Sequence, residues 1–174
     1  KSLGRSYDAS LGDVKHIRAT IEEAKAGLQS IDASLLRGVQ KCWCYQFMLL
    51  PKLLWPLCLY DFPMTKVEVN SRMVSKFLRR WLGVPPSLSD IALYGKCTKL
   101  KLPFSSIVER FKEGKVRLQL LLRDSPDPFI RNAQPELRTG RKWSVVEQIN
   151  TVEEKLYHQK LLGAIQTDRR GFGC

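Results

Sequence analysis

Residues 41–83 read KCWCYQFMLLPKLLWPLCLYDFPMTKVEVNSRMVSKFLRRWLG, and they are the most informative part of the chain for predicting its fold. Its first half is apolar almost all round, which is typical of a helix with neighbours on most sides. Pro51 and Pro56 should kink or split that helix, because proline lacks the amide donor and crowds the preceding turn. The second half places apolar and basic residues at helical spacing, so it predicts an amphipathic helix.

The amphipathic helix is predicted over residues 66–82. Thr65 and Glu68 have the spacing of a capping box at its start, and Gly83 marks its end. At about 100° per residue, the apolar side chains fall within one arc of roughly 140°. They are Val67, Val74, Phe77, Leu78, Trp81 and Leu82. The opposite arc holds five cations: Lys66, Arg72, Lys76, Arg79 and Arg80. We therefore expect one face on a core and the other in solvent, as a basic ridge about 20 Å long.

The flanking segments predict further helices. Apolar residues recur at steps of three and four over residues 13–35, 105–123 and 145–163, whereas residues 84–103 show no such period. The expected fold class is mainly α: a multi-helix bundle with a C-terminal helical extension and little or no β. We divide the chain into residues 1–12, a helical bundle over 13–83, a helical connection region over 84–166 and a flexible tail over 167–174.

The chain is strongly basic. It has 29 Lys and Arg against 17 Asp and Glu, for a net charge of +12. The excess lies in the middle, since residues 41–120 carry 14 basic and 5 acidic side chains. A concentrated excess of this kind favours binding to a polyanion, and an inert basic surface is the alternative.

The cysteines and the apolar stretch indicate where in the cell the protein is expected to lie. The five cysteines are odd in number and follow no disulfide pattern, so we expect reduced thiols and an intracellular protein, of the nucleus or the cytoplasm. Residues 47–62 fall short of the ~20 apolar residues that a membrane span needs. We therefore expect no membrane partner.

No pattern in the sequence predicts a catalytic or metal-binding residue. The doublets Glu22-Glu23 and Glu153-Glu154 lie on predicted helices, where adjacent side chains diverge by about 100°. Cys42 and Cys44 would point away from each other on a helix, and no histidine stands at ligand spacing. We expect no cofactor in this chain.

The basic ridge is the strongest functional candidate. Its cations can neutralise backbone phosphates, and Glu68 is the only acidic residue between positions 62 and 89. Arg141 and Lys142 are a second candidate. Trp143 beside them could stack on a base, but the sequence favours a core position for this tryptophan. The hypothesis requires a free, helical ridge: internal ion pairs at Arg79 and Arg80, or a segment that is not helical, would overturn the case for nucleic-acid binding.

Motifs along the chain resemble the region after the palm in the reverse transcriptases of non-LTR (LINE-type) retrotransposons. The opening Lys1-Ser-Leu-Gly4 is similar to the Lys-Tyr-Leu-Gly segment of that family, with Ser2 in place of tyrosine. The other motifs follow in the family's order: Leu36–Trp43, Leu49–Pro56, Arg79–Gly83, Leu93–Gly95, Leu102-Pro103 and Gly140–Trp143. The resemblance covers nearly the whole chain, which looks cut from something larger.

The resemblance implies a primer-grip remnant over residues 1–12, with Lys1, Leu3 and Gly4 as its contacts. It implies that a thumb-like bundle and a connection region hold the template–primer duplex through its phosphates. The family's Tyr-x-Asp-Asp motif is absent, since Phe62 follows Tyr60-Asp61. The chain would thus not be catalytic by itself, and its partners would include the missing palm, with its Mg²⁺, and the fingers of the same polyprotein. The alternative is a helical protein-interaction module whose basic face meets an acidic partner.

Overall fold

The computed structural model describes residues 13–94, 104–133 and 135–171, with side chains as far as residue 159. Within those residues all regular structure is helical and no strand occurs, so the predicted mainly-α class is confirmed. In chain order the elements are α1 (Val14–Ala33), α2 (Gly38–Cys44), the π-helix η1 (Tyr45–Leu49), α3 (Leu50–Leu59), α4 (Met64–Leu82), α5 (Asp90–Tyr94), α6 (Ile107–Arg123), α7 (Pro128–Ala133) and α8 (Val145–Gly171).

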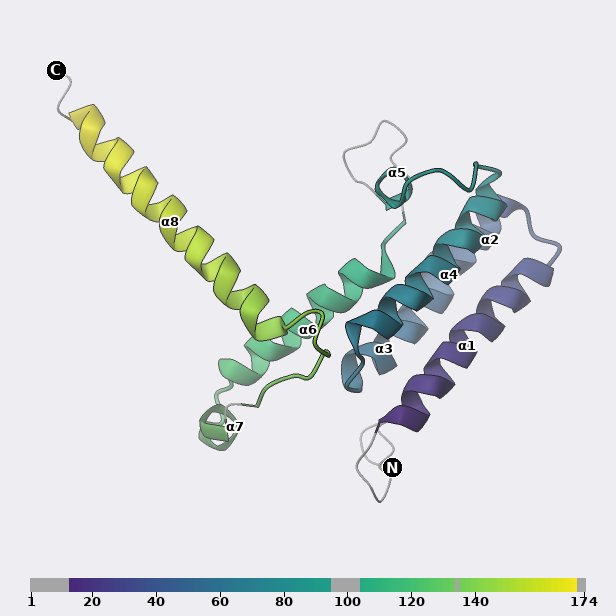
Figure 1. Cartoon of the computed structure of the whole chain (residues 1–174), viewed down its shortest axis with the longest axis horizontal. Helices are drawn as coiled ribbons and strands as arrows, with labels where there is room; N and C mark the ends of the chain where they lie inside the picture. Colours follow the sequence, from purple (N-terminus) through teal and green to yellow (C-terminus); the bar gives the residue numbers. More distant parts are fainter. Residues whose placement is uncertain (1–12, 95–103, 134, 172–174) are drawn as a thin grey trace.

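One core joins the helices of the bundle. Figure 1 shows α1 and α4 at the front, with α2 and α3 behind α4 and α6 beside them. Every one of these segments contributes side chains that are completely buried. The apolar ones include Leu28 of α1, Cys42 of α2, Leu53 and Leu57 of α3, Val67, Val74 and Leu78 of α4, and Ile107 and Phe111 of α6, and Tyr45 of η1 joins them. Because α6 belongs to the predicted connection region, the two regions share this core.

The long apolar stretch is divided near its prolines, as predicted, but by a π-helical turn. Pro51 stands in the first turn of α3 and has no N–H to donate to the carbonyl group of Phe47. The turn before it, η1, is accordingly the wider one. Pro56 lies inside α3 without ending it, and the helix continues to Leu59.

Gly38 lets α2 cross the end of α4 at very short range. A Cβ atom at this position would overlap the carbonyl oxygen of Trp81, which is backbone and cannot turn aside. The indole of Trp81 is buried there and donates its Nε1 hydrogen to Asp32 at 2.8 Å. The close crossing therefore ties α1, α2 and α4 together at one end of the bundle.

Lys115 of α6 caps the C-terminal end of α3. The residue is completely buried, and its Nζ donates to the carbonyl oxygens of Cys58 and Tyr60, both at 2.8 Å. Carbonyl groups at the end of a helix lack partners within that helix, so a cation is a suitable cap for them. The buried ammonium fixes α6 against the end of α3.

The C-terminal helical extension is the long helix α8, which leaves the bundle (Figure 1). Val145 and Ile149 are buried where α8 meets α6, whereas all side chains from 150 to 159 are exposed. The helix continues to Gly171, past the predicted end at 163 and into the segment expected to be a flexible tail. The helix passes through Gly163, because an interior glycine only weakens a helix, by about 1 kcal/mol.

Candidate nucleic-acid interface

The outer face of α4 carries basic residues where the sequence predicts them. Val74 and Leu78 of this helix are completely buried. Lys66, Arg72 and Lys76 lie on the opposite face and are exposed. Within the part of the chain that the structure describes, these three side chains make no hydrogen bond or ion pair. The predicted division of α4 into an apolar and a basic face is therefore confirmed.

The end of α4 follows the prediction, and its start does not. Gly83 adopts the left-handed conformation, with φ of 66°, and its N–H bonds to the carbonyl groups of Arg79 and Arg80. At the start, α4 begins at Met64 with Pro63 as the N-cap, and no side chain caps it. The predicted capping box is wrong, because Glu68 has a stronger partner in the Lys142 ammonium.

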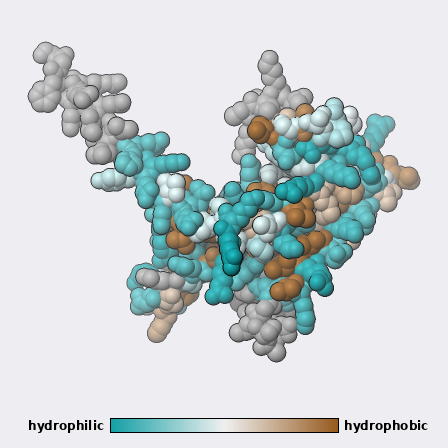
Figure 2. Space-filling view, in the orientation of Figure 1, coloured by the Kyte–Doolittle hydropathy of each residue, from teal (hydrophilic) through white to brown (hydrophobic). Residues whose placement is uncertain are grey.

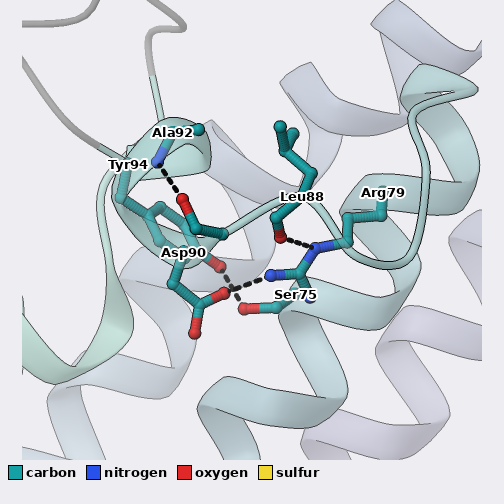
Figure 3. A network of polar contacts seen from close by, with 7 residues as sticks. Ser75, Arg79, Leu88, Asp90, Ala92 and Tyr94 are labelled. Atoms are coloured by element: carbon teal, nitrogen blue, oxygen red, sulfur yellow. Dashed lines mark hydrogen bonds and ion pairs between the residues drawn. The ribbon is translucent and has the colours of Figure 1, made fainter.

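Arg79 is not a free cation, and on this point the prediction is wrong. Its side chain is only 17% exposed. Nε donates to the carbonyl oxygen of Leu88 at 2.9 Å, and Nη2 lies 2.6 Å from Oδ1 of Asp90 (Figure 3). Arg79 lies at the edge of the basic arc nearest the loop that follows α4, so that loop can reach it. Its role is to fasten residues 84–90 to α4.

Another hydrogen bond in Figure 3 secures the short helix α5. The hydroxyl groups of Ser75 and Tyr94 are 3.0 Å apart and buried. Burial raises the pKa of Tyr94 to about 12, although the Ser75 hydroxyl opposes the shift. Together with Arg79, this contact makes the end of α4 a structural junction.

Arg80 is paired but remains accessible. Its guanidinium forms an ion pair with Asp32 of α1, yet its side chain is 61% exposed. The Arg80 Cζ atom also lies 5.3 Å from the centre of the Phe77 ring. The condition set by the sequence is thus met at both residues, since Arg79 and Arg80 each form an ion pair within the chain. The case for nucleic-acid binding therefore passes to Lys66, Arg72 and Lys76, which make no ion pair in the described residues.

A loop from the connection region packs against the start of α4. The Met64 N–H donates to the carbonyl oxygen of Thr139 at 2.8 Å. Gly140 follows with φ of 86°, a conformation that side chains disfavour. Nζ of Lys142 then lies 2.6 Å from Oε2 of Glu68. Arg141 and Lys142, both exposed, are in this way brought next to the outer face of α4.

Glu68 shows how closely the cations gather. Its pKa is lowered, first by the hydrogen bond from Lys142 and then by the charges of Lys142, Arg72 and Lys112. Lys112 comes from α6, and its Nζ lies 5.5 Å from the centre of the Trp143 ring. In the sequence Lys112 belongs to a second basic set, over residues 96–117, whose members share no clear helical face, and nothing in the pattern relates α6 to α4.

Trp143 serves the core rather than the surface. Its ring is 6.1 Å from that of Phe111, and it packs on the buried cluster as a partly buried side chain. The core alternative for this tryptophan is therefore the one that the structure shows. Stacking of a base on Trp143 is not part of the site.

We call the surface built from these cations the basic face. It consists of Lys66, Arg72, Lys76 and Arg80 of α4, Lys112 of α6, and Arg141 and Lys142 of the loop. Its α4 part is about 20 Å long at 1.5 Å per residue. Of the cations predicted to contact nucleic acid, only Arg79 is withdrawn. The primer-grip residues Lys1, Leu3 and Gly4 lie outside the described residues.

Within the described residues, no three His, Cys, Asp or Glu side chains come together as a metal-binding group. None of the described helices combines the length and the apolar character that crossing a membrane demands.

Comparisons of the chain with protein families, with curated proteins and with solved structures give no match. The resemblance to non-LTR reverse transcriptases therefore stays a prediction from the sequence motifs.

Proposed function

We propose that this chain is a thumb and connection segment of a retrotransposon reverse transcriptase. In this proposal it holds the template–primer duplex through backbone phosphates and does not itself contain the catalytic palm. The palm, with its Mg²⁺, and the fingers would be its partners within the same polyprotein, in the nucleus or the cytoplasm. The motif order in the sequence supports the family, and the basic face supports the binding.

The observation that carries the proposal is a row of unpaired cations on one side of α4. Lys66, Arg72 and Lys76 are exposed and make no ion pair in the described part of the chain. Most exposed charges on helices are simply solvated, but here acidic neighbours are almost lacking, and Glu68 is already paired with Lys142. Such a row can exchange counterions for phosphates.

The size of the basic face fits a duplex. Double-stranded nucleic acid carries about one charge per 1.7 Å of axis, so a face of about 20 Å meets more phosphates than it has cations. The number of cations therefore limits the number of contacts. If all seven took part, the logarithm of the affinity would fall with a slope of up to about −6 against log salt.

The face contains little that could read a sequence. Its described groups are ammonium and guanidinium ions on two helices and a loop, and phosphates bind such groups without reference to the bases. We therefore expect similar affinity for duplexes of unrelated sequence. A strong preference for one sequence would contradict a general grip.

A binding experiment tests the proposal directly. The affinity for a labelled duplex is measured at low salt for the wild type and for K66A/R72A/K76A. The matched control R18A/R131A/K155A removes the same charge from exposed cations of α1, α7 and α8. We expect clear weakening in the first variant and a small change in the control. If the two variants lost the same amount of affinity for the duplex, net charge alone would explain the binding, and the proposal would be contradicted.

A second candidate function has one observation in its favour. Apolar side chains more than half exposed form a row along α2, η1 and α3: Val39, Trp43, Phe47, Met48 and Trp55. Exposed apolar patches of this kind often mark a protein interface, so a helical protein-interaction module with an acidic partner is the alternative. In a competition assay, a nonspecific duplex should displace an acidic protein partner only if the basic face binds nucleic acid.

A further inference from the structure

A groove runs between α1 and the second half of α4 and reaches the loop after α4. Its volume is about 840 Å³, within the range of small-molecule sites. α4 and the loop supply apolar walls, through Met73, Phe77, Val84 and Pro86. Figure 2 shows hydrophobic surface between α4 and α1, with hydrophilic surface on either side. The groove is therefore apolar within and polar at its rim.

The rim is cationic. Lys25 of α1 stands on one side, with Lys76 and Arg80 of α4 on the other. No carboxylate lines the groove within the described residues, and the Asp32 carboxylate is paired with Arg80. An apolar interior with a positive rim selects a ligand that joins a flat or apolar body to an anion.

Two side chains suit a nucleobase. The guanidinium of Arg80 lies over the Phe77 ring, with Cζ 5.3 Å from the ring centre. Aromatic rings and guanidinium planes are the groups on which proteins stack unpaired bases. The Phe77 ring is itself held by Trp81, at 5.7 Å between ring centres, so the platform is fixed from behind.

The groove is continuous with the basic face. Lys76 and Arg80 belong to both, so a strand leaving a duplex bound on α4 would meet the groove next. We propose that the groove accepts an unpaired nucleotide at the end of that duplex, with the base against Phe77 and its phosphates near Lys25 and Lys76. This inference rests on the proposed function and specifies its ligand: a duplex with a single-stranded overhang.

The test compares a blunt duplex with the same duplex carrying a short thymidine overhang. The wild type should bind the overhang form more tightly. F77A should lose that advantage, by about 5- to 150-fold, the factor that corresponds to ~1–3 kcal/mol per stacked base. V84W fills the groove with a larger side chain from the loop and leaves the Phe77 ring in place. It therefore tests whether the overhang enters the groove without removing a partly buried side chain. Affinity for the blunt duplex should be unchanged in both.

The cationic rim can be tested separately, through the contact of Lys25 with a phosphate of the overhang. K25Q should reduce the salt slope of overhang binding by about 0.7, the value per phosphate of a single strand. R18Q is the matched control, since Arg18 is an exposed cation on the same side of α1 two turns earlier. It should leave the slope unchanged.

Each outcome decides one of the two claims. Loss of the overhang advantage in F77A and V84W, with blunt binding intact, supports the groove. An advantage that is absent in the wild type, or retained in V84W, overturns the groove and leaves the basic face standing. Failure of the wild type to bind either duplex overturns the proposed function itself. Binding of an acidic amphipathic peptide that V84W blocks would assign the groove to a protein partner instead.

Discussion

Nζ of Lys142 lies 2.6 Å from Oε2 of Glu68, and this ion pair joins a loop of the connection region to the outer face of α4. The two residues are 74 positions apart in the chain. The pair places Arg141 and Lys142 beside the cations of α4, where Arg72 also acts on Glu68. One basic surface is thus assembled from two regions that are separate in sequence.

Glu68 should weaken nucleic-acid binding, because its carboxylate forms an ion pair with the Lys142 ammonium and so competes with a phosphate for it. E68Q removes the charge but keeps an acceptor for the ammonium. We expect tighter duplex binding and a salt slope steeper by up to about 1, since Lys142 becomes available to a phosphate. The measurement is a duplex titration at several salt concentrations. E154Q, which removes an exposed carboxylate of α8, should change the slope less.

The same pair sets a pH dependence. The pKa of Glu68 is lowered in the folded chain from its ordinary value of 4.5, chiefly by the hydrogen bond from Lys142. Its contribution to stability is therefore present above pH 4.5 and is lost as the pH falls through the lowered pKa. Acid unfolding of the wild type and of E68Q, followed by circular dichroism, measures this contribution. Superimposable unfolding curves would show that the Glu68 carboxylate does not contribute to stability.

Arg79 should matter for stability and little for binding. R79A removes a guanidinium that bonds the Leu88 carbonyl group and the Asp90 carboxylate. We expect the free energy of unfolding to fall by about 1.5–3 kcal/mol, the cost of losing a hydrogen bond to a charged group. D90N should lose less, because an amide oxygen still accepts. If R79A reduced the salt slope of duplex binding as much as K76A does, Arg79 would contact nucleic acid after all, and this prediction would be wrong.

Lys115 should be among the most sensitive positions in the fold. K115M keeps the length of the side chain but leaves the carbonyl groups of Cys58 and Tyr60 without their donor. Each unsatisfied buried group costs about 1–3 kcal/mol, so denaturant unfolding should show a large loss of stability. R117M replaces an exposed cation of the same helix and should stay close to the wild type. Equal stability of the two variants would show that the cap contributes nothing.

The fold should lose stability at alkaline pH. Burial raises the pKa of the Cys42 thiol from 9.0 to about 11 and that of Tyr94 from 10.0 to about 12. In the unfolded chain these groups release protons at lower pH, so stability is complete below pH 9 and is lost as the pH rises through 11 and 12. Chemical denaturation from pH 8 upward measures this. Y94F should show a smaller loss with pH than the wild type.

The sequence predicts local features of this fold well. The apolar and basic faces of α4 follow from helical periodicity, which needs no knowledge of the partners. The division near Pro51 follows from a missing amide donor, although the π-turn that results could not be read from the residue types. Gly83 was recognised as the end of α4 for an equally local reason, its tolerance of positive φ.

The features of the basic surface and the core that the sequence does not reveal depend on tertiary contacts. Arg79 looks like any other cation of the ridge until the loop brings Leu88 and Asp90 to it. Lys115 reads as a surface lysine, yet it is completely buried. Lys112 joins the basic face only because α6 packs on α4. Which charges are free is decided by such contacts, so a basic pattern alone overstates the number of available cations.

The salt dependence of duplex affinity is the sharpest test of phosphate binding by Lys66, Arg72 and Lys76. It should be measured for the wild type, for K66A/R72A/K76A and for the control R18A/R131A/K155A. The account predicts that the first variant flattens the slope by up to about 3, one unit per lost phosphate contact, and that the control keeps the wild-type slope. Slopes that are the same in the wild type and in K66A/R72A/K76A would contradict it.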